Sequence, residues 1–346
     1  MKPSGSLRII GIGESAPDPA EMVSSDQVIA LLNQRGVDTK GKSGADTEKL
    51  VGIASRWWSK LDSTEHALRA SRAAIADAEE RSGGAFSAAR IQLVHSGGSS
   101  PDNLFPACAC ELQGRLGIAP EDCEARDISL ACASWLDALM LAGSRMMQKG
   151  QRYGLVAVGE TVGSRLNPLI SLSSCLWGDG GGAVILEYDP DGDKRQGILA
   201  DKAISDGQFA DWTLSKKLGT HPQHDAFEFP EASMLEHGKD IHRYAIRKVP
   251  AAIEELLAAE GLSAEGAYLL PHNANLGMVQ QIGKRLGIPE SRVLTAVVER
   301  GNTSSASIPI TLAREVAAGT FESGDLLIFA AFGGGMAIDL MLYRWP

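Results

Sequence analysis

The stretch GDGGGAVILEYDP (residues 178–190) has a close counterpart at the end of the chain, FGGGMAIDLMLYRWP (332–346). In each, a cluster of glycines runs into an apolar strand, and the two clusters lie close to half of the chain apart. Self-similarity at such a spacing is typical of a duplicated fold. We therefore predict two similar α/β halves, residues 1–190 and 191–346, packed into one body.

Strand and helix patterns alternate around these glycine clusters. SLRIIGIGES (6–15), RIQLVHSG (90–97) and YGLVAVGE (153–160) are short apolar stretches typical of buried strands. The stretch 63–81 has apolar residues at helical spacing and a capping signal in Ser63 and Glu65. The polar stretch 33–48 is rich in Gly and Lys and predicts a surface loop. The alternation predicts an α/β chain with a largely buried sheet.

Composition narrows the class of protein. The chain has 346 residues, of which 44% are hydrophobic, but it has neither a membrane-spanning apolar run nor the apolar middle of a signal peptide. The net charge is −10, with both signs well mixed, which does not favour nucleic-acid binding. Five cysteines, an odd number, fit a reducing compartment. We expect a cytoplasmic protein that binds neither nucleic acid nor membrane.

The stretch ARDISLACASWLDALMLAG (125–143) places Cys132 between a strand-like segment and an apolar helix. A thiol in the first turn of a buried helix lies near free N–H groups and the positive end of the helix dipole, which favour a thiolate and can bind an oxyanion. A free cysteine is also a common core residue. That core role is assigned to the other four, Cys108, Cys110, Cys123 and Cys175. For Cys132 these residues leave both interpretations open.

A nucleophilic cysteine needs a base close to it in space. His272 opens a polar loop after the apolar stretch that ends at Pro271, and Asn302 follows Gly301 and a predicted strand. Polar residues just beyond strand ends are where α/β proteins place their sites. A neutral His and an Asn amide can stabilise a growing enolate, whereas a Cys–His–Asn set also occurs in proteases and hydrolases. The glycine loops and the duplicated strands argue against a papain-like protease.

No metal site is predicted. His221 and His224 form an H-x-x-H pair without a third ligand in view, and the C-x-C of Cys108 and Cys110 has no second pair.

Five segments carry a resemblance to a known family. They are LACAS around Cys132, LWGDGGGAV (176–184), PHNANL (271–276), GNTSSASIP (301–309) and AFGGGM (331–336). In order and spacing they resemble β-ketoacyl-acyl-carrier-protein synthase III (KAS III) of the thiolase superfamily. The resemblance runs from about residue 86 to the C-terminus and more faintly through the first 80 residues. It implies a thiolase-like fold, a duplicated five-layered α-β-α-β-α sandwich, and a homodimer.

The resemblance also implies a reaction. Cys132 would take an acyl group from acyl-CoA or an acyl carrier protein, with no separate cofactor. A malonyl thioester would then lose carbon dioxide, and the carbanion would attack the acyl-cysteine. His272 and Asn302 would hold the malonyl carbonyl, and the N–H groups of Cys132 and Gly334 would form the oxyanion hole. Phe105, in NLFPAC, would reach across the dimer into the acyl pocket.

The substrate pocket departs from the family pattern. We place Trp135 beside Phe105 in the acyl pocket. Val28 and Ser171 stand where a Trp and an Arg usually contact coenzyme A, and Gly277 stands where an Arg is common. Because Arg stacks and forms hydrogen bonds as neither Ser nor Gly can, these changes predict a specialised paralogue with an altered donor, such as a carrier-protein thioester of secondary metabolism.

Two other functions stay open. A related acyltransferase would pass the acyl group from Cys132 to an alcohol or amine, with His272 as general base. A non-catalytic partner subunit would be expected to lack the nucleophile. Exposed cations could dock an acidic carrier protein, and the candidates are Lys216, Lys217, Arg247, Lys248, Lys284 and Arg285.

Overall fold

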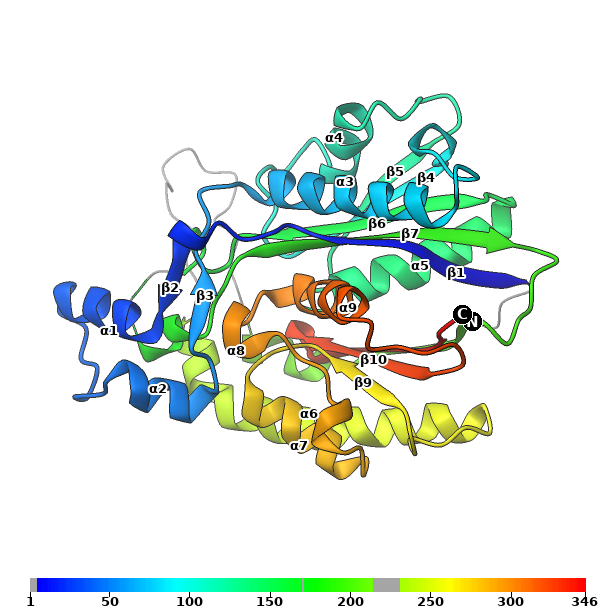
Figure 1. Ribbon diagram of the computed structural model, residues 1–346. Helices are drawn as coiled ribbons and strands as arrows, with labels where there is room; N and C mark the ends of the chain where they lie inside the picture. Colours follow the sequence, from blue (N-terminus) through cyan, green and yellow to red (C-terminus); the bar gives the residue numbers. More distant parts are fainter. Residues whose placement is uncertain (1–4, 168, 170, 214–230) are drawn as a thin grey trace.

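The computed structural model describes residues 5–167, 169, 171–213 and 231–346. Within them, nine strands form one sheet in the order β5-β4-β6-β7-β1-β8-β11-β10-β9. A separate pair, β2 (Met22–Ser24) and β3 (Ser55–Trp57), lies beside α1 (Ser25–Gln34) and α2 (Gly44–Val51) at one end of the molecule (Figure 1). The two chain termini lie at the opposite end.

The sheet consists of two groups of strands with the same pattern. In the first group β7 is antiparallel to β1 and β6, and β4 is parallel to β6 and β5. In the second group β11 is antiparallel to β8 and β10, and β10 is parallel to β9. The first group comprises β1 (Ser6–Glu14), β4 (Leu93–Gly97), β5 (Glu124–Ile128), β6 (Tyr153–Glu160) and β7 (Gly180–Asp189). The second comprises β8 (Gly197–Ser205), β9 (Tyr268–Pro271), β10 (Leu326–Gly333) and β11 (Ala337–Arg344).

Among the described residues, the backbones of the two groups pair where Leu7 of β1 lies beside Gly197 of β8. Beyond β9, an isolated parallel bridge joins Leu269 to Val293, in the position that β5 occupies in the first group. The second half of the chain therefore repeats the strand orientations of the first.

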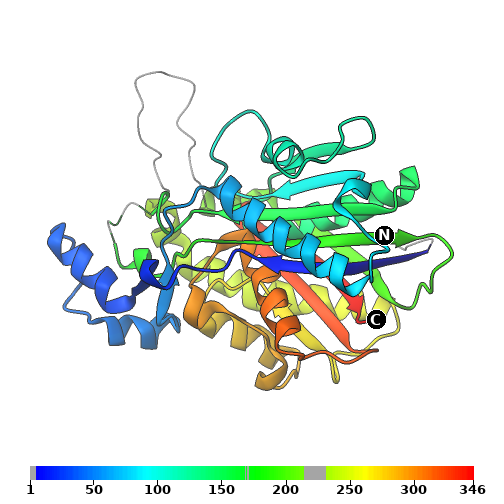
Figure 2. The same ribbon diagram turned by 45° about the horizontal axis from the view of Figure 1, so that its top comes forward.

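Helices complete five layers, as Figures 1 and 2 show. The outer helices of the first group are α3 (Ser63–Arg81) and α4 (Cys108–Arg115). The middle layer holds α5 (Ser134–Lys149) and α9 (Ser307–Ala317), and the other outer layer holds α6 (Glu231–Ala259) and α7 (Leu276–Arg285). One hydrophobic cluster lies on each side of each strand group, and the central one joins both groups through α5 and α9. This confirms the predicted α-β-α-β-α sandwich.

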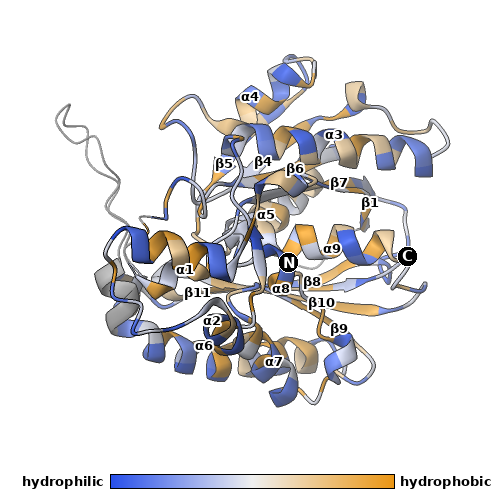
Figure 3. Cartoon of the chain, turned by 60° about the vertical axis from the view of Figure 1, so that its left-hand side comes forward, coloured by the Kyte–Doolittle hydropathy of each residue, from blue (hydrophilic) through white to orange (hydrophobic). Residues whose placement is uncertain are grey.

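Layer position explains the helix sequences. The middle helix α9 buries Ile308, Ile310 and Leu312 and is coloured hydrophobic over much of its length in Figure 3. The outer helices α3 and α6 alternate hydrophobic and hydrophilic colour, because one face packs on the sheet and the other meets water. Within the described residues, no helix is both long and apolar enough to cross a bilayer.

Three local predictions need correction. The N-cap of α3 is Asp62, whose carboxylate accepts from the Glu65 N–H at 2.7 Å, so Ser63 is the first helical residue and not the cap. The predicted loop 33–48 gives way at Gly44 to α2, because Ser43 and Asp46 form a capping box there. Asn302 follows the short helix α8 (Val297–Arg300), not a strand.

Asp339 is a buried carboxyl in the middle of β11, and its Oδ2 has no hydrogen-bond partner within the described residues. Burial, with repulsion from Asp137 and Asp201, raises the pKa of Asp339 to about 7. The folded state therefore holds a proton that the unfolded state loses above its ordinary value of 3.8, so the contribution of Asp339 to stability falls as pH rises through this window.

Asp339→Asn is therefore expected to gain stability relative to wild type between about pH 4 and pH 7. The gain reaches about 4 kcal/mol, since one pKa unit corresponds to about 1.4 kcal/mol. Urea denaturation of both proteins across this range measures the difference. A difference that stays constant with pH would contradict the assignment.

Candidate active site

Cys132 lies in a tight turn between β5 and α5. Ala131 adopts φ +47°, and the N–H groups of Ala133 and Ser134 bond the carbonyls of Leu130 and Ala131 at 3.0 and 3.1 Å. The Ser134 hydroxyl closes the turn, accepting from the Leu130 N–H at 2.7 Å and donating to the Ala131 carbonyl at 2.6 Å. Since α5 begins at Ser134, Cys132 precedes the helix instead of lying in its first turn.

His272 follows the last residue of β9 and is 2% exposed. Its N–H bonds the Ala330 carbonyl at 2.8 Å, which ties the backbone to β10. Its Nδ1 lies 2.9 Å from the Ser307 hydroxyl at the start of α9. If Ser307 donates to Nδ1, the ring carries its proton on Nε2, the nitrogen left for a substrate.

Hydrogen bonds fix both the backbone and the side chain of Asn302. Its N–H bonds the Leu176 carbonyl at 2.7 Å, and its carbonyl accepts from the Gly178 N–H at 3.0 Å. Its Oδ1 accepts from the Ser304 N–H at 2.9 Å. A bound carbonyl oxygen would therefore meet the Nδ2 end of the amide, which is a donor.

Cys132, His272 and Asn302, from three separate segments, line one small cavity of about 110 Å³. Its other walls are mostly apolar and come largely from α6, α7 and the β10–β11 corner; among them are Trp177, Ile241, Tyr244, Ala245, Met278, Phe332, Gly333, Gly334, Met336 and Ile338. Apolar walls exclude water, which strengthens any hydrogen bond to a developing charge.

Burial leaves both ionisable groups uncharged at neutral pH. It raises the pKa of the Cys132 thiol to about 11, against the lowering effect of the Ser304 hydroxyl. It lowers the pKa of His272 to about 4, against the raising effect of the Ser304 backbone. The expected stabilisation of the thiolate by the helix is therefore outweighed by desolvation. The site lacks the thiolate–imidazolium pair of a papain-like protease and instead offers a neutral thiol and a neutral imidazole.

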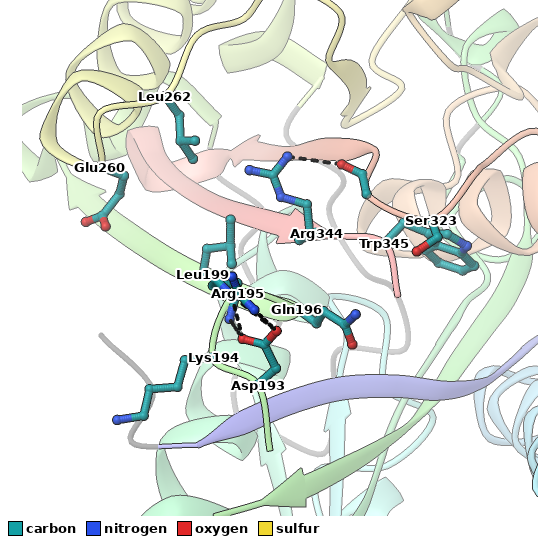
Figure 4. A pocket seen from close by; sticks show the side chains of 11 residues that line it. Asp193, Lys194, Arg195, Gln196, Leu199, Glu260, Leu262, Ser323, Arg344 and Trp345 are labelled. Carbon is teal, nitrogen blue, oxygen red and sulfur yellow. Dashed lines mark hydrogen bonds and ion pairs between the residues drawn. The ribbon is translucent and has the colours of Figure 1, made fainter. Parts of the chain in front are cut away.

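A larger cavity, of about 690 Å³, lies at the terminus end of the molecule (Figure 4). Asp193 and Arg195 form an ion pair there at 2.9 Å, and Arg344 Nη1 donates to the Gly324 carbonyl at 3.0 Å. None of the three polar site residues lines it. We therefore place the candidate active site in the smaller cavity.

Known proteins share both the sequence and the fold. Residues 126–207 match the family 3-oxoacyl-[acyl-carrier-protein (ACP)] synthase III, and residues 257–345 match its C-terminal family. A beta-ketoacyl-[acyl-carrier-protein] synthase III of Xanthomonas oryzae pv. oryzae is 33% identical over 316 residues, 87% of this chain and 93% of that relative. The chain belongs to the β-ketoacyl-[acyl-carrier-protein] synthase III family.

Solved structures agree with this membership. The 3-oxoacyl-(acyl carrier protein) synthase III of Pseudomonas aeruginosa PAO1 matches 99% of this chain and 98% of its own, with 27% identity and a TM-score of 0.84. The priming β-ketosynthase of the R1128 polyketide pathway shares the fold, with 24% identity, a TM-score of 0.83 and coverage of 100% of this chain and 98% of its own.

Neither residue predicted for the acyl pocket of this synthase III family member lines the cavity at Cys132. Trp135 does not line the cavity at Cys132: it is fully buried in the central hydrophobic cluster, because it lies on the inner face of α5. Phe105 is 83% exposed, in the loop between β4 and α4, and is absent from the cavity walls of its own chain. Gly334 does line the cavity, and Gly333 packs so closely on Cys132 that a Cβ there would lie 2.8 Å from the Cys132 nitrogen.

The positions that depart from the synthase III pattern offer no cation. Val28 is fully buried in a small cluster with Ile29, Leu32 and Cys175. Ser171 caps the short 3-10 helix Leu172–Cys175, and Gly277 lies in the first turn of α7.

Some predictions fall outside the described residues: His221, His224, Lys216 and Lys217. In the part of the chain that the structure covers, no three His, Cys, Asp or Glu side chains are arranged to hold a metal ion.

The sequence analysis missed two polar residues behind the thiol, Ser304 and Glu160. Ser304 follows Asn302 in the same loop, and its hydroxyl lies 3.4 Å from the Cys132 sulfur. Glu160 is the last residue of the buried strand β6. The rule that singled out His272, a polar residue at a strand end, applies equally to Glu160.

Proposed function

We propose that this synthase III family member loads an acyl group on Cys132 and condenses it with a malonyl-type thioester. The observation that carries the proposal is the meeting of a neutral thiol, a neutral imidazole and a carboxamide in one apolar cavity. The product is a β-ketoacyl thioester, of the kind used in fatty-acid or polyketide-type secondary metabolism.

In the first half-reaction the Cys132 sulfur attacks the carbonyl carbon of an acyl thioester. A new C–S bond forms, the donor's C–S bond breaks, and the donor leaves as a thiol. The carbonyl oxygen carries negative charge in between. The N–H groups of Cys132 and Gly334 are the proposed donors to that oxygen, and Gly333 allows the two segments to approach closely.

In the second half-reaction a malonyl thioester loses carbon dioxide. The electron pair of the broken C–C bond moves toward the thioester carbonyl, whose oxygen becomes enolate-like. His272 and Asn302 are the proposed donors to this oxygen, a role that suits an imidazole with a pKa of about 4. The carbanion then attacks the acyl-cysteine carbonyl, and Cys132 leaves as a thiolate.

We infer an acyl carrier protein as the preferred donor and extender carrier. The buried Val28 and the small Ser171 and Gly277 supply neither an aromatic platform nor a cation for a nucleotide. The exposed cations of α6 and α7 suit an acidic carrier protein, in a chain whose net charge is −10; they are Arg247, Lys248, Lys284 and Arg285.

Intact-mass measurement after incubation with matched acyl-CoA and acyl-carrier-protein thioesters tests the donor. Malonyl thioester is then added, and carbon dioxide and product length are measured. Faster loading from the carrier protein, followed by carbon dioxide and a lengthened chain, is expected. Loading without carbon dioxide would favour acyl transfer to an alcohol or amine, and no loading would favour a partner subunit.

We further propose a homodimer in which Phe105 enters the partner's acyl pocket. Leu104 and Phe105 are 63% and 83% exposed, and β5 is an edge strand of the sheet. Exposed apolar side chains beside an unpaired strand edge are typical of an interface. Light scattering of wild type and Phe105→Asp measures the oligomeric state. Twice the chain mass is expected for wild type, and a weaker association is expected for the variant.

A further inference from the structure

A line of hydroxyl groups runs from the Cys132 thiol to a buried carboxylate. The Ser304 hydroxyl donates to the Cys132 sulfur at 3.4 Å and lies 2.9 Å from the Ser99 hydroxyl. The Ser99 hydroxyl donates to Glu160 Oε1 at 2.9 Å. The line joins residues far apart in the sequence, and the left-handed backbone of Ser304, at φ +50°, places its hydroxyl between the thiol and Ser99.

Glu160 has no exposed surface. Within the described residues it pairs with no Lys, Arg or His; its partners are the Ser99 N–H at 3.0 Å and the hydroxyls of Ser99, Ser100 and Ser305. A buried carboxylate held only by hydroxyls and a backbone amide can exchange a proton with them, because each hydroxyl is both donor and acceptor.

Among the described residues, the buried histidines near the line are uncharged at neutral pH. His66 of α3 and His95 of β4 are buried, and burial lowers the pKa of both, so each is neutral at pH 7. His272 is neutral too and is bonded to Ser307. Asp137 of α5 repels Asp339 of β11. The carboxyl group of Glu160 is among the causes that raise the pKa of the Cys132 thiol, so it disfavours the thiolate.

In this arrangement, the shift of one proton avoids a second buried negative charge. A thiolate formed beside an ionised Glu160 would put two like charges into one water-poor site, which is costly. Moving the thiol proton onto Glu160 leaves a single negative charge, now on sulfur. The number of buried charges stays the same.

We propose that Glu160 accepts the Cys132 proton through Ser304 and Ser99 when the thiol attacks the acyl donor. The Ser304 hydroxyl, which donates to the sulfur at rest, first turns toward Ser99. The S–H then gives its proton to Ser304, Ser304 gives its own to Ser99, and Ser99 gives its own to Glu160. The leaving thiolate of the donor takes the proton back along the same line, so Glu160 ends each loading step ionised. Glu160 thus acts through two serines as a positioning residue. The inference rests on the proposed role of Cys132 as acyl carrier.

Alkylation of Cys132 by iodoacetamide, measured by peptide mass from about pH 6 to pH 10, tests the proton path without any acyl donor. In wild type the rate should rise by clearly less than tenfold per pH unit across neutral pH, because the relay adds a pH-independent part of the rate to the part that comes from thiolate formed by solvent. Glu160→Gln keeps the size of the side chain but accepts no proton at these pH values. It is expected to react about 10²-fold more slowly at pH 7 and to gain about tenfold per pH unit.

Charge repulsion alone predicts the opposite effect of Glu160→Gln on the alkylation rate. Removing a negative charge beside the thiol would favour the thiolate and speed alkylation at pH 7, so a faster or unchanged Glu160→Gln would overturn the proposal. Ser304→Ala breaks the line without touching the carboxylate and should reproduce the pH slope, which keeps the test valid if Glu160→Gln does not fold.

Ser305→Ala is the matched control, because Ser305 donates to Glu160 but lies off the line to Cys132. Ser305→Ala should keep the shallow wild-type profile. A slope in Ser305→Ala equal to that of Glu160→Gln would overturn the relay. Since alkylation needs neither acyl donor nor malonyl thioester, a failed relay leaves the condensation proposal intact. Loss of acyl loading with a shallow, wild-type alkylation profile would instead count against the condensation proposal.

Discussion

Cys132→Ala takes up no acyl group from any thioester, and its condensation rate falls by about 10⁴-fold or more. The reason is that a covalent acyl-enzyme cannot form without the sulfur, so the two half-reactions can no longer be separated. Intact mass after incubation with acyl-carrier-protein and acyl-CoA thioesters measures loading, and a radiolabelled malonyl thioester measures condensation.

Cys175→Ala is the control for Cys132→Ala. Cys175 is also buried, but it packs with Val28 and Leu32 away from the cavity. It should lose a little stability and retain loading. If Cys132→Ala still gains the acyl mass while Cys175→Ala does not, the nucleophile has been assigned to the wrong cysteine.

His272→Ala and Asn302→Ala should separate the two half-reactions. Each keeps the thiol and should load the acyl group, but each loses one donor to the enolate oxygen. Carbon dioxide release is expected to fall by about 10²- to 10³-fold for each, the usual effect of removing one such donor. Single-turnover mixing of the preloaded variants with malonyl thioester measures the step.

Asn275→Ala is the matched control for Asn302→Ala. Asn275 lies close to the cavity but accepts from the Met278 N–H at 2.9 Å as the N-cap of α7. Its loss should cost about 1 kcal/mol of stability and leave decarboxylation intact.

Because burial holds the pKa of His272 near 4, wild-type decarboxylation should also show no titration of His272 between about pH 5 and pH 8. A titration step in the decarboxylation rate near pH 6.5, the ordinary pKa of histidine, would contradict the lowered pKa of His272.

Local sequence patterns predicted much of the fold. The glycine clusters at 180–182 and 333–335, each leading into an apolar strand, predicted the duplication, and the periodicity of 63–81 predicted α3 with its bounds. His272 was singled out because a polar residue follows an apolar strand. The duplication and the bounds of α3 are confirmed, because both depend on neighbours in the chain. The role of His272 stays a prediction.

Other features depend on contacts that sequence spacing does not encode. Trp135 appeared to be a pocket residue, but the packing of α5 between the two strand groups buries it. The Cys132 thiol was expected to have its pKa lowered by a helix, but the cavity walls from α6, α7 and β10 remove water and raise it. Desolvation is set by everything that surrounds a group.

Sequence patterns alone predicted the order of the elements, the duplication and the candidate site residues Cys132, His272 and Asn302, because each is marked by residues next to it. Only the tertiary structure decided their charge states and their partners. Ser304 and Cys132 are 172 positions apart, and Ser305 and Glu160 are 145 apart. Hydrogen bonds and burial at such separations arise when the five layers close, and no local pattern specifies them.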